Sequence, residues 1–171
     1  YAHQVRVDPT GNSVILPTRG NVATATTPED PGAIKVYGYK DGILTNRLSV
    51  APNGGRDFQP RHVDFHPTKP FLYATIEAQN KLHVYGMLSG PTLTPTPLFT
   101  KETLRHPDHR QGQATSAIHV HPKGRFLYLG NRGLTMTNFN GKKVLGDVEN
   151  SIAVYSINQQ SGEPTLIQSA D

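Results

Sequence analysis

Cysteine and tryptophan are absent from the 171-residue chain, and charged residues make up only 18 % of it. Without cysteine there is no disulfide framework, no thiolate nucleophile and no cysteine-ligated zinc. No apolar run approaches the roughly 18 residues that a membrane helix needs. We therefore expect no membrane partner.

The first residues are not expected to be a signal peptide, because the stretch from Tyr1 to Arg6 lacks both a charged region and an apolar region. The lack of cysteine leaves the redox compartment open. We expect a cytoplasmic protein whose true N-terminus lies upstream of this sequence, with a periplasmic or secreted location as the alternative.

The net charge of +4 arises from 17 basic and 13 acidic residues that are scattered along the chain. Lys142 and Lys143 form the only adjacent basic pair. A nucleic-acid site would need a basic stripe with stacking aromatics or a recognisable module. The charge pattern favours a solvated basic surface, and we expect no nucleic-acid partner.

Glycine and proline are abundant, with 16 and 14 residues, which indicates many turns and makes long helices unfavourable. One pattern occurs three times: an alternating run begins at His3, Arg61 and Ser116 and ends at Pro9, Pro67 and Pro122. Three further apolar runs follow in each copy: Ser13–Leu16, Ile34–Tyr37 and Ile43–Ala51; Phe71–Ala74, Leu82–Tyr85 and Leu93–Thr100; Phe126–Leu129, Ile152–Tyr155 and Thr165–Ala170. Alternation over four to six residues is typical of half-buried strands.

Four antiparallel strands per copy, repeated in tandem, predict an all-β chain of about three β-propeller blades, at residues 1–52, 58–105 and 114–171. A β-sandwich is the alternative, although sandwiches do not usually repeat a strand order together with its turns. Three blades cannot close a ring, and open sheet edges would remain. We therefore expect a fragment whose remaining blades come from missing residues or from another chain.

The connection between the second and third strands varies in length among the three copies. It is long at Gly20–Ala33 and Gly133–Ser151 but short at Ala78–Lys81. Loops that grow on one face of a constant scaffold are common binding elements. We expect these two loops to be irregular, because each contains turn-forming residues: Pro28, Pro31 and Gly32 in the first, and Asn138, Asn140 and Gly141 in the second.

The start of each first strand and the end of each second strand should meet at one end of the blade, here called the mouth. The residues at these two positions lie sixteen apart in every copy and form the pairs His3 with Arg19, Arg61 with Glu77, and Ser116 with Arg132. Five of the six side chains are ionisable, whereas the scaffold positions are apolar. We expect the six to converge at the mouth, the alternative being exposed strand ends with an Arg61–Glu77 surface ion pair.

Three guanidinium groups at one mouth can hold a carboxylate or phosphate and stabilise an oxyanion. Glu77 and His3 are then the groups able to exchange a proton near neutral pH. This composition predicts a small anionic substrate. We expect no cofactor and no metal, because the other histidines lie in strand interiors or in the loop from His106 to His109, without a convergent set of acidic ligands.

At these residues the chain resembles the lactonase family of seven-bladed β-propellers, which includes propeller-type 6-phosphogluconolactonases and 3-carboxy-cis,cis-muconate lactonising enzymes. The similarity spans nearly the whole chain and rests on ordered motifs: Ala2-His-Gln-Val5, Gln59-Pro-Arg-His62, His66-Pro67, Glu77, Gly124-Arg-Phe-Leu-Tyr-Leu-Gly-Asn-Arg-Gly133 and Ser151-Ile-Ala-Val-Tyr155. Tyr1 and Ile76 depart from the family pattern, where His and Asn are common.

The resemblance implies a catalytic cluster of His3, Arg61, Glu77 and Arg132, to which we add Arg19 and Ser116 as substrate-binding residues. It also implies hydrolysis of a small anionic sugar lactone such as 6-phosphogluconolactone. Glu77 or His3 would activate water. Lactonisation of carboxymuconate and a propeller that only binds a ligand or partner remain as alternatives.

Overall fold

The computed structural model describes residues 1–146 and 148–171. Its elements are β-strands and three short 3-10 helices, and the described part of the chain contains no α-helix. The predicted all-β fold is confirmed. The high content of glycine and proline explains it, since both residues disfavour helix interiors and support tight turns.

The first sheet has four antiparallel strands in chain order: β1 (Arg6–Val7), β2 (Ser13–Thr18), β3 (Ala33–Lys40) and β4 (Ile43–Val50). Asp41 and Gly42, with φ of 50° and 82°, join β3 to β4. Positive φ at both central residues is the two-residue hairpin geometry that Asp-Gly favours.

The second sheet contains one strand more than expected. Its strands are β5 (Pro60–Phe65), β6 (Phe71–Ile76), β7 (Lys81–Leu88), β8 (Thr92–Leu93) and β9 (Phe99–Glu102). The short 3-10 helix η1 (Pro52–Gly55) precedes β5, and η2 (Glu77–Gln79) joins β6 to β7. Both β8 and β9 pair with β7, so the single fourth strand expected over residues 93–100 is wrong. Pro95 and Pro97 lie between the two short strands, where a continuous ladder would lack their N–H donors.

The third sheet follows η3 (Pro107–His109) and contains β10 (Gln113–Val120), β11 (Phe126–Gly133), β14 (Ile152–Ile157) and β15 (Pro164–Ala170). A separate hairpin, β12 (Met136–Phe139) with β13 (Lys142–Leu145), lies between β11 and β14. The expectation that this loop is irregular was therefore wrong. Asn140 and Gly141 adopt φ of 49° and 76°, so the Asn-Gly pair joins two strands rather than breaking them.

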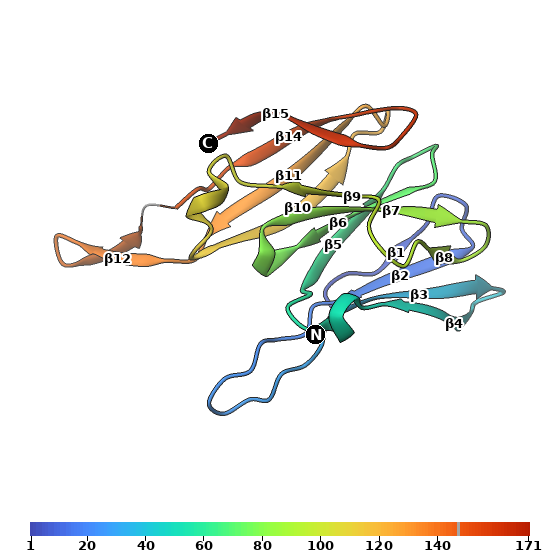
Figure 1. Ribbon diagram of the computed structural model, residues 1–171, viewed down its shortest axis with the longest axis horizontal. Coiled ribbons are helices and arrows are strands. Elements are labelled where there is room, and N and C mark those ends of the chain that lie inside the picture. Colours follow the sequence, from blue (N-terminus) through green and yellow to red (C-terminus); the bar gives the residue numbers. More distant parts are fainter. Residues whose placement is uncertain (147) are drawn as a thin grey trace.

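The three sheets lie side by side in chain order, and the loop after β2 and the β12–β13 hairpin project from the same end of the sheets (Figure 1). One apolar core fills the space between the first and second sheets and includes Ile15, Val36, Leu72 and Ala74. A second core between the second and third sheets includes Tyr73, Val84, Leu127 and Tyr155. Each blade thus buries its neighbour's face.

The inner strands β5 and β10 each contain a β-bulge near the mouth. Pro60 pairs with Ile76 and Val63 with Ala74, so Arg61 and His62 both stand opposite Thr75. Ser116 and Ala117 likewise stand opposite Gly130. The facing pairs expected from sixteen-residue spacing are not backbone partners: Ile118 opposite Leu129 already puts Arg132 one residue out of register with Ser116, and the bulge adds one more, so that Arg132 pairs with Ala114. The side chains of one expected pair, Arg61 and Glu77, nevertheless form an ion pair. Bulges re-aim side chains.

Candidate functional site

Glu77 lies where β6 ends and η2 begins, and it is only 3 % exposed. Its backbone N–H donates to the carbonyl of Gln59 at 2.8 Å. Asn80, which is fully buried and has φ of 51°, ends the short helix and turns the chain into β7. The position of the Glu77 carboxylate therefore depends on a tight turn at the mouth.

Three arginine side chains contact the Glu77 carboxylate, one from each sheet. Arg19 follows β2 and contacts Oε2 through Nε; Arg132 on β11 donates from Nη2 to Oε1 at 2.5 Å. Arg61 on β5 places Nε 3.5 Å from Oε1. Three positive charges against one buried negative charge leave two in excess, which favours an anionic ligand.

Arg61 connects this ion cluster to Ser116 directly and to His3 through His62. Its Nη1 donates to Ser116 Oγ at 3.0 Å and contacts His62 Nδ1 at 3.3 Å. Because a guanidinium only donates, Nδ1 of His62 is the acceptor, and the proton of the neutral ring sits on Nε2. The His62 ring meets the His3 ring edge to face, with 5.1 Å between centroids.

Both imidazoles favour the neutral form. Burial, with a smaller contribution from the adjacent Arg61 charge, lowers the pKa of His62 to about 4. Burial also lowers the pKa of His3, again with a contribution from Arg61. At pH 7 each ring therefore keeps an unprotonated nitrogen.

The other five side chains expected at the mouth gather around Glu77, either directly or through Arg61 and His62. The expected pair of Arg61 with Glu77 forms within the second blade, whereas Arg19, Arg132 and Ser116 make their contacts to residues of that blade rather than to their expected partners. His62 was not among the candidates. Its neighbour Arg61 belonged to the same Pro-Arg-His motif, but strict alternation would have placed consecutive residues on opposite faces, and only the bulge brings both to the mouth.

A cavity of about 400 Å³ lies beside this cluster and is lined by Arg19, Glu77, Gln59, Arg110 and Leu134, among others. Its size is in the range of small-molecule sites. The Nε–H groups of Arg61 and Arg132 are buried and make no hydrogen bond within the described residues. Arg61 and Arg132 do not line the cavity, and the guanidinium groups placed to meet an anionic ligand in it are those of Arg19 and Arg110.

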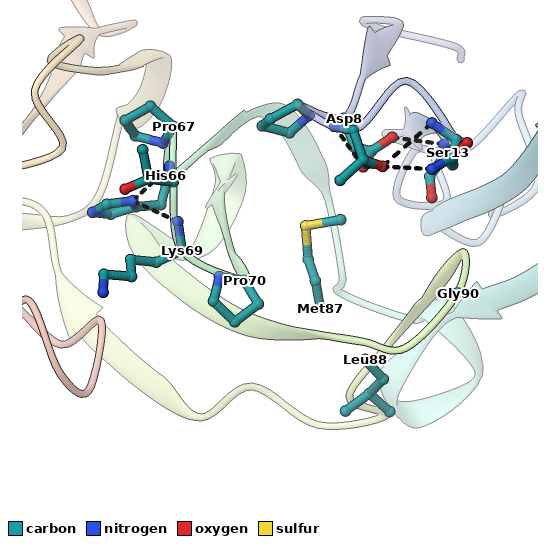
Figure 2. A pocket seen from close by; sticks show the side chains of 13 residues that line it. Asp8, Ser13, His66, Pro67, Lys69, Pro70, Met87, Leu88 and Gly90 are labelled. Atoms are coloured by element: carbon teal, nitrogen blue, oxygen red, sulfur yellow. Dashed lines mark hydrogen bonds between the residues drawn. The ribbon is translucent and has the colours of Figure 1, made fainter.

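A larger groove of about 520 Å³ lies at the opposite end of the sheets, between the β1–β2 turn and the β5–β6 turn (Figure 2). Two of its polar side chains hold the turns: the Asp8 carboxylate accepts from Ser13 N and Thr10 N, and His66 Nδ1 accepts from Thr68 N and Lys69 N, while His66 Nε2 is buried without a hydrogen bond among the described residues. These bonds stabilise the turns. The groove has no charge cluster like that around Glu77, so we place the candidate site at the mouth.

No group of three or more metal-ligating side chains gathers within residues 1–146 and 148–171. His106 and His109 lie 6.0 Å apart between ring centroids, and His109 Nε2 is 3.5 Å from the Asp108 carboxylate on an exposed turn. In the same described residues, no helix is long and apolar enough to cross a membrane.

The cluster and the three-blade arrangement can be compared with known proteins. Residues 1–171 match the family model described as "Lactonase, 7-bladed beta-propeller". The chain belongs to this lactonase family. It is 34 % identical to the 6-phosphogluconolactonase of Bacillus subtilis over 143 residues, and 28 % identical to that of Formosa agariphila over 148 residues; each match covers 81 % of this chain.

The chain spans 35 % and 36 % of the length of these two relatives. Among solved structures it is similar to the periplasmic gluconolactonase of Pseudomonas aeruginosa, with a TM-score of 0.67 and 20 % identity over the whole chain and 41 % of that protein. A Lactobacillus plantarum protein matches with a TM-score of 0.63 and 22 % identity, over 99 % of this chain and 45 % of that one. These likenesses show a propeller segment.

Proposed function

We propose that the intact protein hydrolyses a small anionic sugar lactone such as 6-phosphogluconolactone. The observation that supports this most directly is the convergence of three guanidinium groups, one from each sheet, on the single buried carboxylate of Glu77. The excess positive charge beside a cavity suits a phosphate or carboxylate. The two curated relatives named above are both 6-phosphogluconolactonases.

In this proposal Arg19 and Ser116 bind the phosphate or another anionic group of the substrate. Arg61 and Arg132 stabilise the negative charge that develops on the lactone carbonyl oxygen. Their Nε–H groups are buried and make no hydrogen bond among the described residues, although Arg61 Nε lies 3.5 Å from Glu77 Oε1, and donor bonds in such a partly desolvated site are strong.

His3 is the more suitable base of the two candidates. Both oxygens of Glu77 contact guanidinium groups, whereas the His3 ring favours the neutral form. His3 takes a proton from water as the water oxygen attacks the lactone carbonyl carbon. Collapse of the tetrahedral intermediate breaks the ring C–O bond, and His3 returns the proton to the departing alkoxide. Glu77 holds the arginines together.

The names of the curated relatives favour hydrolysis over the lactonisation of carboxymuconate. A cytoplasmic location is part of the same proposal, since the proposed substrate is a phosphorylated sugar. Cell fractionation of the source organism tests the location separately from the activity.

A direct test measures lactone hydrolysis by the purified intact protein, after subtraction of the spontaneous rate. We expect kcat/KM for 6-phosphogluconolactone to exceed that for unphosphorylated gluconolactone by at least about tenfold, because one additional charge contact is worth about 1.4 kcal/mol or more. Arg19→Ala should remove most of this preference. Carboxymuconate is the competing substrate; turnover of it alone, or no rate above background, would contradict the proposal.

A further inference from the structure

The blade fold does not require a histidine at the position of His62. The corresponding residue, five before the turn proline, is Gln4 in the first blade and Ala117 in the third. Gln4 Oε1 accepts from Val63 N at 2.7 Å and so joins two blades, while Ala117 has no polar side-chain group. The scaffold thus forms with three different residues at this position.

We propose that His62 is a positioning residue, which orients Arg61 through Nδ1 and supports the His3 ring by edge-to-face contact. This inference rests on the proposed lactonase function, since Arg61 and His3 are the oxyanion donor and the base in that proposal. His62 is the residue that contacts both of them, at 3.3 Å and at 5.1 Å between ring centroids.

The backbone of His62 is held firmly enough for such a role. Its N–H donates to Thr75 Oγ1 at 3.0 Å, and its carbonyl lies 3.3 Å from the same hydroxyl. Thr75 is fully buried, and its Oγ1 also lies 3.2 Å from the carbonyl of Ser116 on the neighbouring blade. The bulge is therefore fixed to two blades, and the ring has a defined direction.

The electrostatic surroundings of His62 involve four elements. Arg61 on β5 and His3 before β1 are its direct contacts, Glu77 on η2 lies beyond Arg61, and His119 approaches from β10. Arg61 and both histidines disfavour a charge on His62, and Glu77 favours one. These surroundings favour the neutral form of the His62 ring. In the proposal, the neutral ring accepts a hydrogen bond from Arg61 and shields His3 from water.

Two substitutions separate the two contacts. His62→Asn keeps an acceptor, because Asn Oδ1 can replace Nδ1, but removes the ring; His62→Phe keeps the ring and removes the acceptor. For His62→Phe we expect KM for 6-phosphogluconolactone to rise by about tenfold, with kcat changed by less than about threefold. For His62→Asn we expect KM to stay within about twofold.

His62→Asn should instead shift the pH profile. Loss of the ring exposes His3 to water, so the pKa of His3 should rise toward its usual value and the acid limb of kcat/KM should move to higher pH by roughly half a unit. A proton NMR titration of His3 in the intact His62→Asn protein should show the same shift, whereas in His62→Phe the pKa of His3 should remain at its wild-type value. His109→Asn, at an imidazole with 70 % of its side-chain surface exposed, is the matched control.

The proposal would be overturned if both variants lost activity equally, with no separation between a KM effect in His62→Phe and a pH-profile shift in His62→Asn. Unchanged kinetics together with an unchanged His3 titration in both variants would also overturn it. The NMR titration needs no turnover. If the wild-type protein hydrolyses no lactone, the proposed function fails, but the His3 titration in the Asn and Phe variants still decides whether His62 supports His3.

Discussion

The charged side chains at the mouth stabilise one another as a set. Glu77 is almost completely buried, and the side chain of Arg61 is only 14 % exposed, so both have lost much of their hydration. A buried carboxylate is tolerated when opposite charges replace water around it. Here the replacement comes from three different blades, which makes Glu77 both an organiser of the site and a contact between sheets.

Glu77→Gln tests this role at the residue scale. Removal of the negative charge leaves three guanidinium groups to repel one another, so we expect the free energy of unfolding to fall by about 3 kcal/mol. Separation of the arginines should lower kcat/KM by about 100-fold or more. Chemical denaturation and lactone hydrolysis by the intact protein measure the two effects.

Glu163→Gln is the isosteric control for Glu77→Gln, because Glu163 forms an ion pair with Lys101 while 41 % of its side-chain surface is exposed. An exposed pair contributes little, so this variant should change stability by less than about 1 kcal/mol. Equal stability losses at the two positions would argue against a special role for the buried carboxylate.

At the scale of the elements, two side chains on β6 pack against the third sheet at the end opposite the mouth, and within the described residues no such contact with a turn glycine is made from the corresponding positions on β2. The Phe71 ring packs against Gly162, where an added Cβ would lie 2.6 Å from the ring, and Tyr73 Oη donates to the carbonyl of Gly162 at 2.9 Å. Ser13 and Ile15 occupy the corresponding positions on β2. Gly90, in the turn of the second sheet, faces open space there, which explains the groove in Figure 2.

Tyr73→Phe tests the contact between the second and third sheets. It removes the donor to Gly162 but keeps the buried ring, so we expect the free energy of unfolding to fall by about 1 kcal/mol. Thermal unfolding of the intact protein provides the measurement. Tyr39→Phe, at a residue that is 44 % exposed, should leave the melting temperature unchanged. An equal fall in the melting temperature of both variants would contradict a stabilising role for the Tyr73–Gly162 hydrogen bond.

At the scale of the whole molecule, polar contacts across the blades supplement the two apolar cores. The buried Asp64 carboxylate accepts from Arg6 of the first blade and from Val120 N of the third, at 2.8 Å in the latter case. Several histidines are also enclosed between the sheets. His83 is 8 % exposed and stacks on Phe58, with 6.1 Å between ring centroids.

The enclosed histidines should make stability fall in acid. Burial lowers the pKa of both His62 and His83 to about 4, against an ordinary value of 6.5 in the unfolded chain. Between these values the unfolded state binds more protons than the native state, so their contribution is complete above pH 6.5 and is lost as the pH falls toward 4. Melting temperatures of the intact protein should therefore stay nearly constant from pH 7.5 to about pH 6.5 and decline from there to pH 4.5.

His83→Phe isolates one part of this acid sensitivity, since it keeps an aromatic ring next to Phe58 and removes the titrating group. The variant should lose less stability than the wild type between pH 6.5 and pH 4.5. A melting temperature of the wild type that stays constant across this range would show that the buried histidines do not control acid unfolding.

The repeat in the sequence was sufficient to predict most strands, their antiparallel order and the gathering of the six side chains at the mouth, but not the two short strands β8 and β9 or the β12–β13 hairpin. These properties depend on local alternation and on positions counted from a turn proline, both of which are visible along the chain. The expected register was wrong by two residues at the mouth. One comes from the turn, since Val63 opposite Ala74 and Ile118 opposite Leu129 already differ by one residue from the expected count, and one comes from the bulge, which the alternation of β5 and β10 does not indicate. The β12–β13 hairpin could have been predicted from Asn140-Gly141.

The sequence by itself determined which residues reach the mouth, since a position in a repeated strand and its chemical type are local properties. Only the tertiary structure decided that Arg19, Arg61 and Arg132 share one carboxylate, and that His62 joins them. These contacts arise where neighbouring sheets pack against each other, and the packing is set by the apolar faces of whole blades. No spacing within one blade specifies the distance to the next.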